Sequence, residues 1–295
     1  MTTADRVLVR RFARAAEPLH SCSYYADEIT QFDRVGYSGW WHAYFAYRSA
    51  PLGPASSAEV TEVFYNFAPR MVARAVPGCW DILNPRQTRT MHLELVEAAL
   101  SRIFNEYNFI APLDPLVDSL RTGLTGLNSE DRPLFGAWAD ESWPQSSLLG
   151  LWHASTLLRE YRFDAHNLAL RNAGISGLGS HLLMAADGRG TPQVIQKIRG
   201  WTQQEWDSEA SLLHERGWLD STMGYTELGR TERKLIESET DNGCLELCSA
   251  LDKSTLTNAL SVLEAIAQYL IEFDVVPGRW PPAHLGKLDP STNQD

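Results

Sequence analysis

The stretch from Arg199 to Asp241 constrains the fold of this chain more than any other part of the sequence. Thr202 can cap a helix, and Glu205 three positions later completes a capping box. Apolar residues then recur at helical spacing, namely Trp206, Ala210 and Leu213. Gly217 suits the end of that helix because glycine tolerates the left-handed conformation that often follows a last turn. The segment therefore predicts a helix over 203–216 with both ends specified.

The residues that follow predict a short β-hairpin and a further helix. Trp218–Leu219 favours a strand, Ser221–Gly224 has the composition of a turn, and Tyr225 starts the returning strand. Thr226 can then cap the next helix. A helix, a two-stranded wing and a long helix form the end of a winged-helix domain. We therefore expect such a domain over 191–276.

The chain before this domain is predicted to be helical. Apolar residues recur at helical spacing between Pro and Gly boundaries over residues 4–16, 25–35, 40–48, 57–67, 69–76, 85–107, 115–127, 132–140, 148–173 and 178–186. The first of these helices is expected to end before Pro18. No segment before residue 110 alternates polar and apolar residues over any length, so no sheet is expected there.

The predicted fold class is mainly α: an all-helical N-terminal part followed by a winged-helix domain with a short β-hairpin wing. We expect an N-terminal domain over 1–110, central helices over 111–190 that include the long helix 148–173, the winged-helix domain and a C-terminal helix over 191–276, and a tail over 277–295. The last helix, Leu256–Phe273, is amphipathic, as are many helices that pack against a partner subunit. We therefore expect a homodimer.

Composition and missing motifs exclude several classes of function. The sequence contains no run of about 18 apolar residues, so no membrane span is expected. The first twenty residues carry arginines without an apolar core, which argues against a secretory signal and for a cytoplasmic protein. There is no Gly-rich phosphate loop, no dinucleotide fingerprint, no GxSxG and no HExxH. We therefore expect neither a cofactor nor a metal ion.

The charge of the predicted recognition helix argues against DNA binding. Such a helix presents Arg, Lys, Asn or Gln to base edges and cations to phosphates. Residues 203–216 carry four carboxylates against Arg216 alone, and the net charge of the whole chain is −11. Because phosphate binding weakens steeply without cations, we do not expect nucleic acid as a partner. One basic patch stands out in the first helix, formed by Arg10, Arg11 and Arg14. A solvated helix face is the favoured explanation of that patch, ahead of a binding site.

The most concentrated polar stretch lies in the long predicted helix over 148–173. Helical spacing places Arg159, Arg162 and His166 on one face. An adjacent face carries His153, Glu160 and Asp164. One interpretation is a catalytic cleft, in which one histidine transfers a proton, one carboxylate tunes its pKa, and one arginine holds an anionic or carbonyl group. The other interpretation is a ladder of ion pairs on a solvated helix face.

A second group of candidate substrate-binding residues lies mostly outside this stretch. Its members are Trp152, Tyr24, Tyr44, Arg48 and Arg70. The chain has ten tryptophans, and aromatic side chains can line a pocket for a planar or apolar ligand. The same side chains also serve as core and interface anchors. His20 lies four residues before Tyr24, so one helix face can present both, provided that Pro18 does not interrupt the helix.

Several segments together resemble a known family. The segments that carry the resemblance are Glu17–Tyr24, Tyr44–Pro54, Phe64–Trp80, Leu151–His166 and Arg199–Asp241. Over nearly its whole length the chain is similar to actinobacterial helix-turn-helix proteins described as SalK-like. The resemblance implies an all-helical first part and a winged-helix second part. It associates the chain with specialised metabolism without naming a reaction.

One departure from the family pattern bears on the candidate cleft. Where the family typically reads REHRGDGH, this chain reads REYRFDAH, so that the two glycines correspond to Phe163 and Ala165 and a histidine to Tyr161. Bulkier residues beside the same charged groups would reshape a pocket. The change favours a member adapted to a particular ligand, although drift in a purely structural helix would look the same.

Three functions follow from these observations. The one that the residues favour is a small-molecule-binding protein on a winged-helix scaffold. It would act as a cofactor-independent acid–base tailoring enzyme of lyase, cyclase or hydrolase type on a natural-product intermediate. The alternative is a ligand-responsive transcriptional regulator, and a further alternative is a resistance protein that sequesters its ligand. The enzyme predicts a closed pocket between the two halves of the chain. The regulator predicts a dimer with two cation-bearing winged helices about 34 Å apart.

Overall fold

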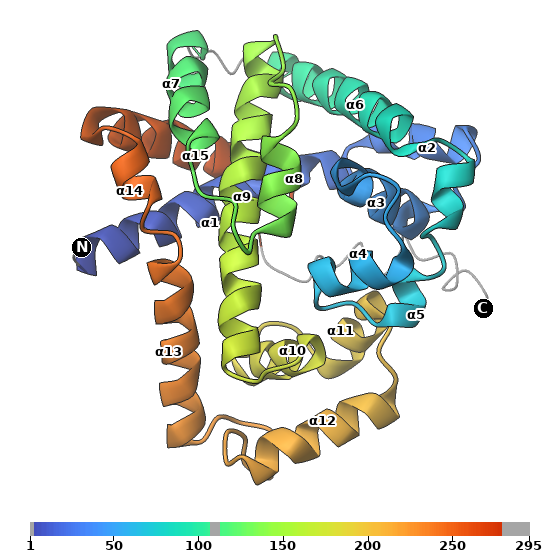
Figure 1. The fold of residues 1–295 in the computed structure, drawn as a ribbon, viewed down its shortest axis with the longest axis vertical. Coiled ribbons are helices and arrows are strands. Elements are labelled where there is room, and N and C mark those ends of the chain that lie inside the picture. The colour runs from blue at the N-terminus through green and yellow to red at the C-terminus, as the bar shows by residue number, and fades with distance from the viewer. Residues whose placement is uncertain (1–2, 107–112, 279–295) are drawn as a thin grey trace.

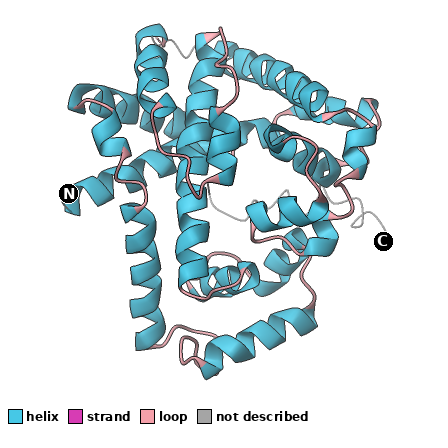
Figure 2. Cartoon of the chain, viewed as in Figure 1, coloured by secondary structure: helices cyan, strands magenta, loops and turns pink. Residues whose placement is uncertain are grey.

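The computed structural model describes residues 3–106 and 113–278, and helices dominate this part of the chain (Figures 1 and 2). The first elements are α1 (Thr3–Tyr25), η1 (Asp27–Thr30), α2 (Gln31–Arg34), α3 (Trp40–Ser49), η2 (Ala50–Leu52), α4 (Ser57–Phe64), α5 (Pro69–Val72), η3 (Gly78–Asp81) and α6 (Pro85–Glu106). The central elements are α7 (Asp114–Thr125), α8 (Pro133–Ala139), α9 (Ser147–Asn172) and α10 (Gly177–Ala186). The last are α11 (Pro192–Arg199), α12 (Gln203–Glu215), α13 (Glu227–Asn242), α14 (Leu247–Ala250) and α15 (Lys253–Glu272). The mainly helical fold class is confirmed.

Helix α9 is the axis of the molecule and runs down the middle of Figure 1. Ser146 caps it by accepting a hydrogen bond from the backbone N–H of Leu149. With 26 residues, α9 is about 39 Å long at 1.5 Å per residue. Helices α1, α6, α7, α8 and α13 all pack against it. Because neighbours surround α9 over most of its length, polar residues in its middle are buried as well as apolar ones.

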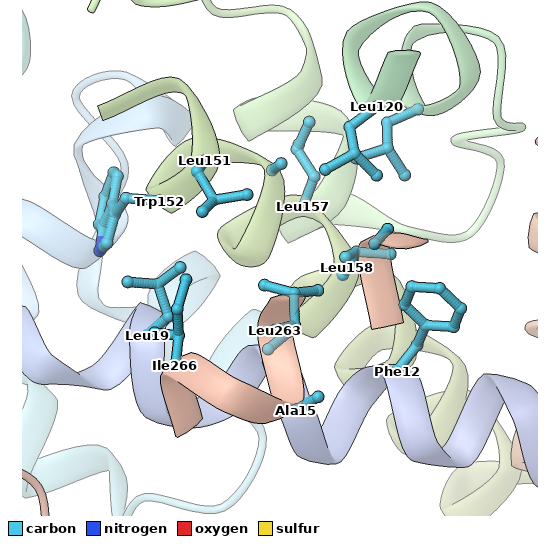
Figure 3. Close-up of a cluster of buried hydrophobic side chains, with 14 of the residues drawn as sticks. Phe12, Ala15, Leu19, Leu120, Leu151, Trp152, Leu157, Leu158, Leu263 and Ile266 are labelled. Carbon is cyan, nitrogen blue, oxygen red and sulfur yellow. The ribbon is translucent and has the colours of Figure 1, made fainter. Parts of the chain in front are cut away.

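The largest core lies where α1, α7, α9 and α15 meet (Figure 3). Phe12 and Leu19 of α1, Leu157 of α9 and Leu263 of α15 are each at most 1% exposed. Burial of an aliphatic or aromatic side chain of this size contributes about 1.5–3 kcal/mol. These contacts therefore fix α1 across α9 and position the first turns of α1 beside the second half of the chain.

A second core is formed by aromatic residues of α3, α4 and the segment between α4 and α5. Phe45, Phe64 and Phe67 are almost completely buried, and the rings of Phe45 and Phe67 are 4.9 Å apart in an edge-to-face arrangement. Aromatic pairs of this geometry add to the stabilisation that comes from burial. This core places α4 and α5 against α10 and α11, where Ala68 N–H donates to the carbonyl of Arg199 at 2.9 Å.

Helices α10 to α13 form a third core and follow the order expected for the end of the chain. Thr202 and Glu205 make the predicted capping box at the start of α12, and Thr226 caps α13. Gly229, in the first turn of α13, lies so close to the hairpin that an added Cβ would meet the carbonyl oxygen of Trp218 at 2.0 Å. The first turn of α13 is thereby fixed against the segment that follows α12.

The predicted two-stranded wing is wrong for the described residues, which contain a single antiparallel bridge between Leu219 and Tyr225. Asp220 accepts hydrogen bonds from the N–H groups of Thr222 and Gly224 at 2.8 and 3.1 Å, which holds residues 220–224 in a turn. Thr226 already caps α13. The turn and the cap leave room for one bridging pair instead of two strands.

The first helix is longer than the sequence predicts and continues through Pro18 to Tyr25. Proline inside a helix removes one hydrogen bond and clashes with the preceding turn, at a cost of about 3 kcal/mol. The buried face of α1 runs from Val9 to Leu19 and beyond, and its contacts with α9 and α15 offset that cost. His20 and Tyr24 consequently lie on one face of α1.

Other predicted helices differ at their ends. The helix expected over 25–35 is replaced by η1 and α2, because Ala26 is extended with φ −66° and ψ 140°. The helix expected over 57–67 is capped by Ser56 and ends at Phe64, where Tyr65 has φ 64°. The helix expected over 69–76 stops at Val72, ahead of Pro77. A proline has no N–H with which to extend a helix.

Helix α15 does not present its apolar face to a partner subunit, contrary to the expectation from its amphipathic pattern. Leu256, Leu260, Leu263 and Leu270 are buried within the same chain, where α15 packs on α1 and α7. A homodimer therefore stays a prediction that would need another surface. The domain boundaries also stay predictions. The tail expected from residue 277, with Trp280, lies outside the described residues except for positions 277 and 278.

Candidate functional site: an arginine-lined cavity

An open cavity of about 1040 Å³ lies between α1 and α9 on one side and α10 and α13 on the other. The walls come from the first half of α1, the C-terminal half of α9, helix α10 with the loop after it, and the middle of α13. Figure 1 shows α13 alongside α9, with α12 crossing below them. Small-molecule sites in proteins typically occupy about 300–1,000 Å³, so this cavity has room for a sizeable ligand.

The charge of the cavity lining is opposite to that of the protein. Nine of its 26 lining residues are Arg or Lys and four are Asp or Glu. The whole chain has 26 Arg and Lys among 295 residues and a net charge of −11. Basic residues are thus about four times as frequent in the lining as in the sequence. A concave surface lined by one sign of charge focuses its field and attracts ligands of the opposite sign.

Arg162 of α9 is at the centre of an ion-pair network that joins three walls of the cavity. Its Nη1 donates to Asp241 Oδ1 of α13 at 2.6 Å, and its Nη2 donates to Glu237 Oε2 at 3.0 Å. Arg10 of α1 also donates to Asp241, whose side chain is only 2% exposed. Arg233 binds the other oxygen of Glu237 at 2.6 Å. Side chains that line the cavity therefore also hold α1, α9 and α13 together.

His166 lies on the cavity wall, and one of its ring nitrogens already makes a hydrogen bond within the protein. Its Nδ1 is 2.9 Å from Thr240 Oγ1, and that hydroxyl donates to the carbonyl of Ile236 at 2.8 Å. The Nδ1–H is therefore the donor to Thr240, which leaves Nε2 as an acceptor. Burial lowers the pKa of His166 to about 4, and the guanidinium groups of Arg233 and Arg162 contribute to the shift. His166 is neutral at physiological pH.

Phe163 and Arg159 form the inner wall of the cavity. The guanidinium of Arg159 lies 4.6 Å from the centre of the Phe163 ring, and that of Arg48 lies 5.0 Å from it. Arg159 donates to Glu160 at 2.7 Å and to Glu17 at 3.2 Å. The bulky residue that stands where the resembled family has glycine thus contacts two arginines.

Behind this wall lies a buried polar cluster that contains four of the predicted residues. Arg48 and Glu160 have side chains that are 3% and 0% exposed and are 3.3 Å apart. Arg48 Nη1 also donates to the hydroxyl of Tyr44 at 2.8 Å. The hydroxyl of Tyr24 is 2.5 Å from His20 Nε2 in the same region of the core. These residues do come together, but Tyr24, Tyr44 and Arg48 do not line the cavity.

The other predicted residues of α9 lie in the core. Asp164 accepts a hydrogen bond from the backbone N–H of Phe135 at 2.8 Å and so caps the first turn of α8. Burial raises the pKa of Asp164 to about 7. The ring of His153 lies 4.8 Å from that of Trp143, and burial lowers the pKa of His153 to about 3. Trp152 donates through Nε1 to the carbonyl of His20 at 3.2 Å.

The expected pairing of a histidine with a carboxylate is not formed among the described residues. Neither His153 nor His166 makes a hydrogen bond with Asp164 or Glu160. Arg159, Arg162 and His166 line the cavity, as their common helix face predicts. Arg70 lies elsewhere, on the surface, where it pairs with Glu205 of α12 at 2.5 Å.

Several charged residues of the cavity were not among the site residues predicted from the sequence. These are Arg6, Arg10, Arg14, Arg189, Arg199, Arg233, Lys234, Glu237 and Asp241. The signal for part of this set was present, because Arg6, Arg10 and Arg14 recur every four residues and must share a face of a helix. No local pattern could show that this face of α1 meets α13, which follows more than 200 residues later.

The surface of α12 carries the negative charge that its sequence predicts. Asp207 and Glu215 are exposed, and Glu209 accepts a hydrogen bond from Ser176 at 2.7 Å. Arg216, the cation at its end, donates to the carbonyl groups of Ala173 and Gly174. A phosphate that approached α12 would therefore meet more carboxylates than available cations.

The described residues also bear on metal binding and on membrane insertion. No three His, Cys, Asp or Glu side chains gather closely enough there to hold a metal ion. No helix within residues 3–106 and 113–278 has the length and hydrophobicity that a membrane crossing requires.

The fold and the cavity define a helical protein organised around a helix-turn-helix segment. Helices α11 and α12 are joined at Gly200, which has a left-handed conformation with φ 77°, and α13 closes the segment. The chain belongs to the helix-turn-helix family, whose model matches residues 9–277. No curated protein and no solved structure matches the chain. The narrower SalK-like grouping stays an expectation from the sequence.

Proposed function

We propose that this protein is a ligand-responsive member of the helix-turn-helix family. A small molecule binds in the arginine-lined cavity, and the segment from α10 to α13 changes its position relative to α9 in response. The observation that carries this proposal is that α13, which closes the helix-turn-helix segment, is a wall of the cavity, and that α10, another wall, packs on α11 and α12 of that segment. A ligand can shift an equilibrium only through contacts that differ between two states, and this location provides such contacts.

The ion-pair network supports the coupling. Arg162 binds Asp241 and Glu237 of α13 while it also lines the cavity. An anionic ligand that draws the guanidinium of Arg162 toward itself weakens its bonds to α13. The position of α13 relative to α9 would then depend on whether the ligand is bound. Helix α12 is connected to α13 through residues 216–226, where the carbonyl of Trp218 packs closely on Gly229 of α13.

Transcriptional regulation is the role that the family membership supports. To test this role, genomic DNA fragments that bind the protein at low salt are selected. The affinity of the protein for the selected duplexes is then measured by fluorescence polarisation. We expect sequence-specific binding that changes when Arg162 is replaced by Glu, because that substitution reverses a charge in the cavity and not on α12. Failure to enrich any sequence would remove the regulator role and leave ligand binding standing.

An acid–base tailoring enzyme is the second candidate, and two observations favour it. The surface of α12 is acidic, which disfavours phosphate contacts, and His166 presents a neutral Nε2 at the cavity wall. An enzyme of this kind would turn over the molecule that binds in the cavity, and His166→Gln would abolish turnover without weakening binding. Equal rates in the wild type and in this variant would exclude His166 as the base. A homodimer and a setting in specialised metabolism remain predictions from the sequence.

A further inference from the structure

The cations of the cavity differ in how far they are already neutralised. Arg10 and Arg162 bind Asp241, Arg233 binds Glu237, and Arg159 binds Glu160. These arginines hold helices together and have carboxylates against them. They contribute less to ligand binding than a cation without a partner, because a ligand must compete for them with an internal carboxylate.

Arg6 also lines the cavity without an ion pair, but it donates to Asn242 Oδ1 at 2.8 Å. Three other exposed cations of the lining have neither an ion pair nor a side-chain hydrogen bond among the described residues. Arg14, Arg189 and Lys234 are exposed, and none lies within ion-pair distance of an Asp or Glu among the described residues. They come from three different elements: α1, the loop after α10, and α13. All three nevertheless border the same cavity. Cations that border one cavity from three sides make its potential more positive, which favours an anionic ligand there.

The field around His166 supports this arrangement. The charges of Arg189, Arg233 and Arg162 all act to lower the pKa of this histidine, and the charge of Glu237 opposes them. Arg189 of the loop therefore lies close enough to act on the wall formed by α9. The positive charge of the loop and that of α9 act on the same volume.

We propose that the ligand carries a multivalent oxyanion of the phosphate class and that Arg14, Arg189 and Lys234 bind it. This inference rests on the proposed function and specifies the ligand. A single carboxylate has one charge and two oxygens in a plane, which one guanidinium can satisfy. Three cations from three elements match a tetrahedral group with at least two charges. Phe163, Leu170 and Met184 add an apolar wall, and the volume of about 1040 Å³ exceeds the needs of a bare phosphate. The oxyanion is thus one end of a larger organic molecule.

Isothermal titration with pyrophosphate, at constant ionic strength, tests this proposal on the full chain. We expect saturable binding of pyrophosphate, weaker binding of inorganic phosphate and no binding of acetate. Each of Arg14→Gln, Arg189→Gln and Lys234→Gln should weaken pyrophosphate binding about tenfold, since a charge-assisted hydrogen bond is lost each time. All three side chains are exposed, so the variants should keep the melting temperature of the wild type.

The matched control is Arg230→Gln. Arg230 is an exposed cation of α13 one turn before Lys234 and does not line the cavity. Its substitution should leave the affinity within twofold. Absence of pyrophosphate binding, binding that survives the triple variant, or equal binding of acetate would overturn the proposal. So would displacement of bound pyrophosphate by short DNA duplexes of unrelated sequence, because the cations would then serve a nucleic acid backbone. A neutral molecule recovered from the cavity would refute the oxyanion and still support a ligand site.

Discussion

Arg162 of α9 and Asp241 of α13 are joined by a hydrogen bond of 2.6 Å, although 79 residues separate them in the chain. The carboxylate of Asp241 is 2% exposed and also accepts from Arg10 of α1. One buried side chain thus connects the N-terminal helix, the central helix and the helix that closes the helix-turn-helix segment. The same arginines face the cavity, so that stability and ligand binding depend on the same groups.

Replacement of Asp241 by Asn should destabilise the protein by about 2–4 kcal/mol, because two guanidinium groups lose their common buried counter-charge. Urea denaturation followed by circular dichroism measures the change. Glu264→Gln is the matched control, since Glu264 also accepts from an arginine of α1 but its side chain is 42% exposed. An exposed pair is worth about 0–1 kcal/mol. Similar losses in both variants would show that Asp241 has no special role.

Removal of the Glu160 charge should be more damaging. Glu160→Gln leaves Arg48 buried without a counter-charge, and breaking such a pair costs about 3–5 kcal/mol. The double variant Arg48→Met with Glu160→Gln should recover part of that loss, because the uncompensated cation is gone. A double-mutant cycle from urea denaturation gives the coupling between the two residues. A coupling near zero would mean that the pair does not contribute to the fold.

The close approach of α10 to α4 can be tested with a single methyl group. At Gly177 an added Cβ would meet the carbonyl oxygen of Tyr65 at 1.8 Å, so Gly177→Ala must displace α10 from its neighbour. We expect a fall in melting temperature of at least several degrees, since backbone atoms cannot move aside locally. Gly78→Ala is the control, because nothing lies within 4 Å of its added Cβ. An unchanged melting temperature in Gly177→Ala, together with a lower one in Gly78→Ala, would contradict this packing.

Acid should destabilise the protein below about pH 6.5. Burial lowers the pKa of six histidines: the partly buried His42 and the five deeply buried residues His20, His92, His153, His166 and His181. In the unfolded chain these histidines become protonated near pH 6.5, whereas in the folded chain His92 and His166 become protonated only near pH 3–4. The contribution of their burial to the free energy of unfolding is therefore complete above pH 6.5 and is lost as the pH falls through this window. Asp164 has the opposite sign, because its pKa is raised to about 7, and offsets one histidine.

The expected size of the acid effect is on the order of 1 kcal/mol per histidine for each pH unit below 6.5. Urea denaturation at pH 7.5, 6.5 and 5.5 measures it. His166→Gln should make the pH dependence shallower, and Asp164→Asn should make it steeper. Constant stability from pH 7.5 to 5.5 would contradict the burial of these side chains.

Local patterns in the sequence predicted most of the helices and little of the site. The capping box at Thr202 and Glu205 and the cap at Thr226 were predictable because each depends on neighbouring residues. The continuation of α1 through Pro18 was not, because it depends on contacts with α9 and α15 that the local sequence does not contain.

The candidate site shows the same limit. Arg159, Arg162 and His166 share a face because a helix has a fixed period, and that face lines the cavity. Asp164 was expected to act on a histidine, but it caps α8 instead, since Phe135 approaches it from another helix. The remaining cations became recognisable as a set only when the fold brought α1, α9 and α13 together.

A crystal structure of the full chain grown with pyrophosphate would show directly whether the arginine-lined cavity binds an oxyanion. We predict density for the ligand between α1, α9, α10 and α13, in contact with Arg14, Arg189 or Lys234, and an altered distance between Arg162 and Glu237. A structure in which this cavity is closed, or in which the ligand lies on the surface of α12 instead, would contradict this prediction.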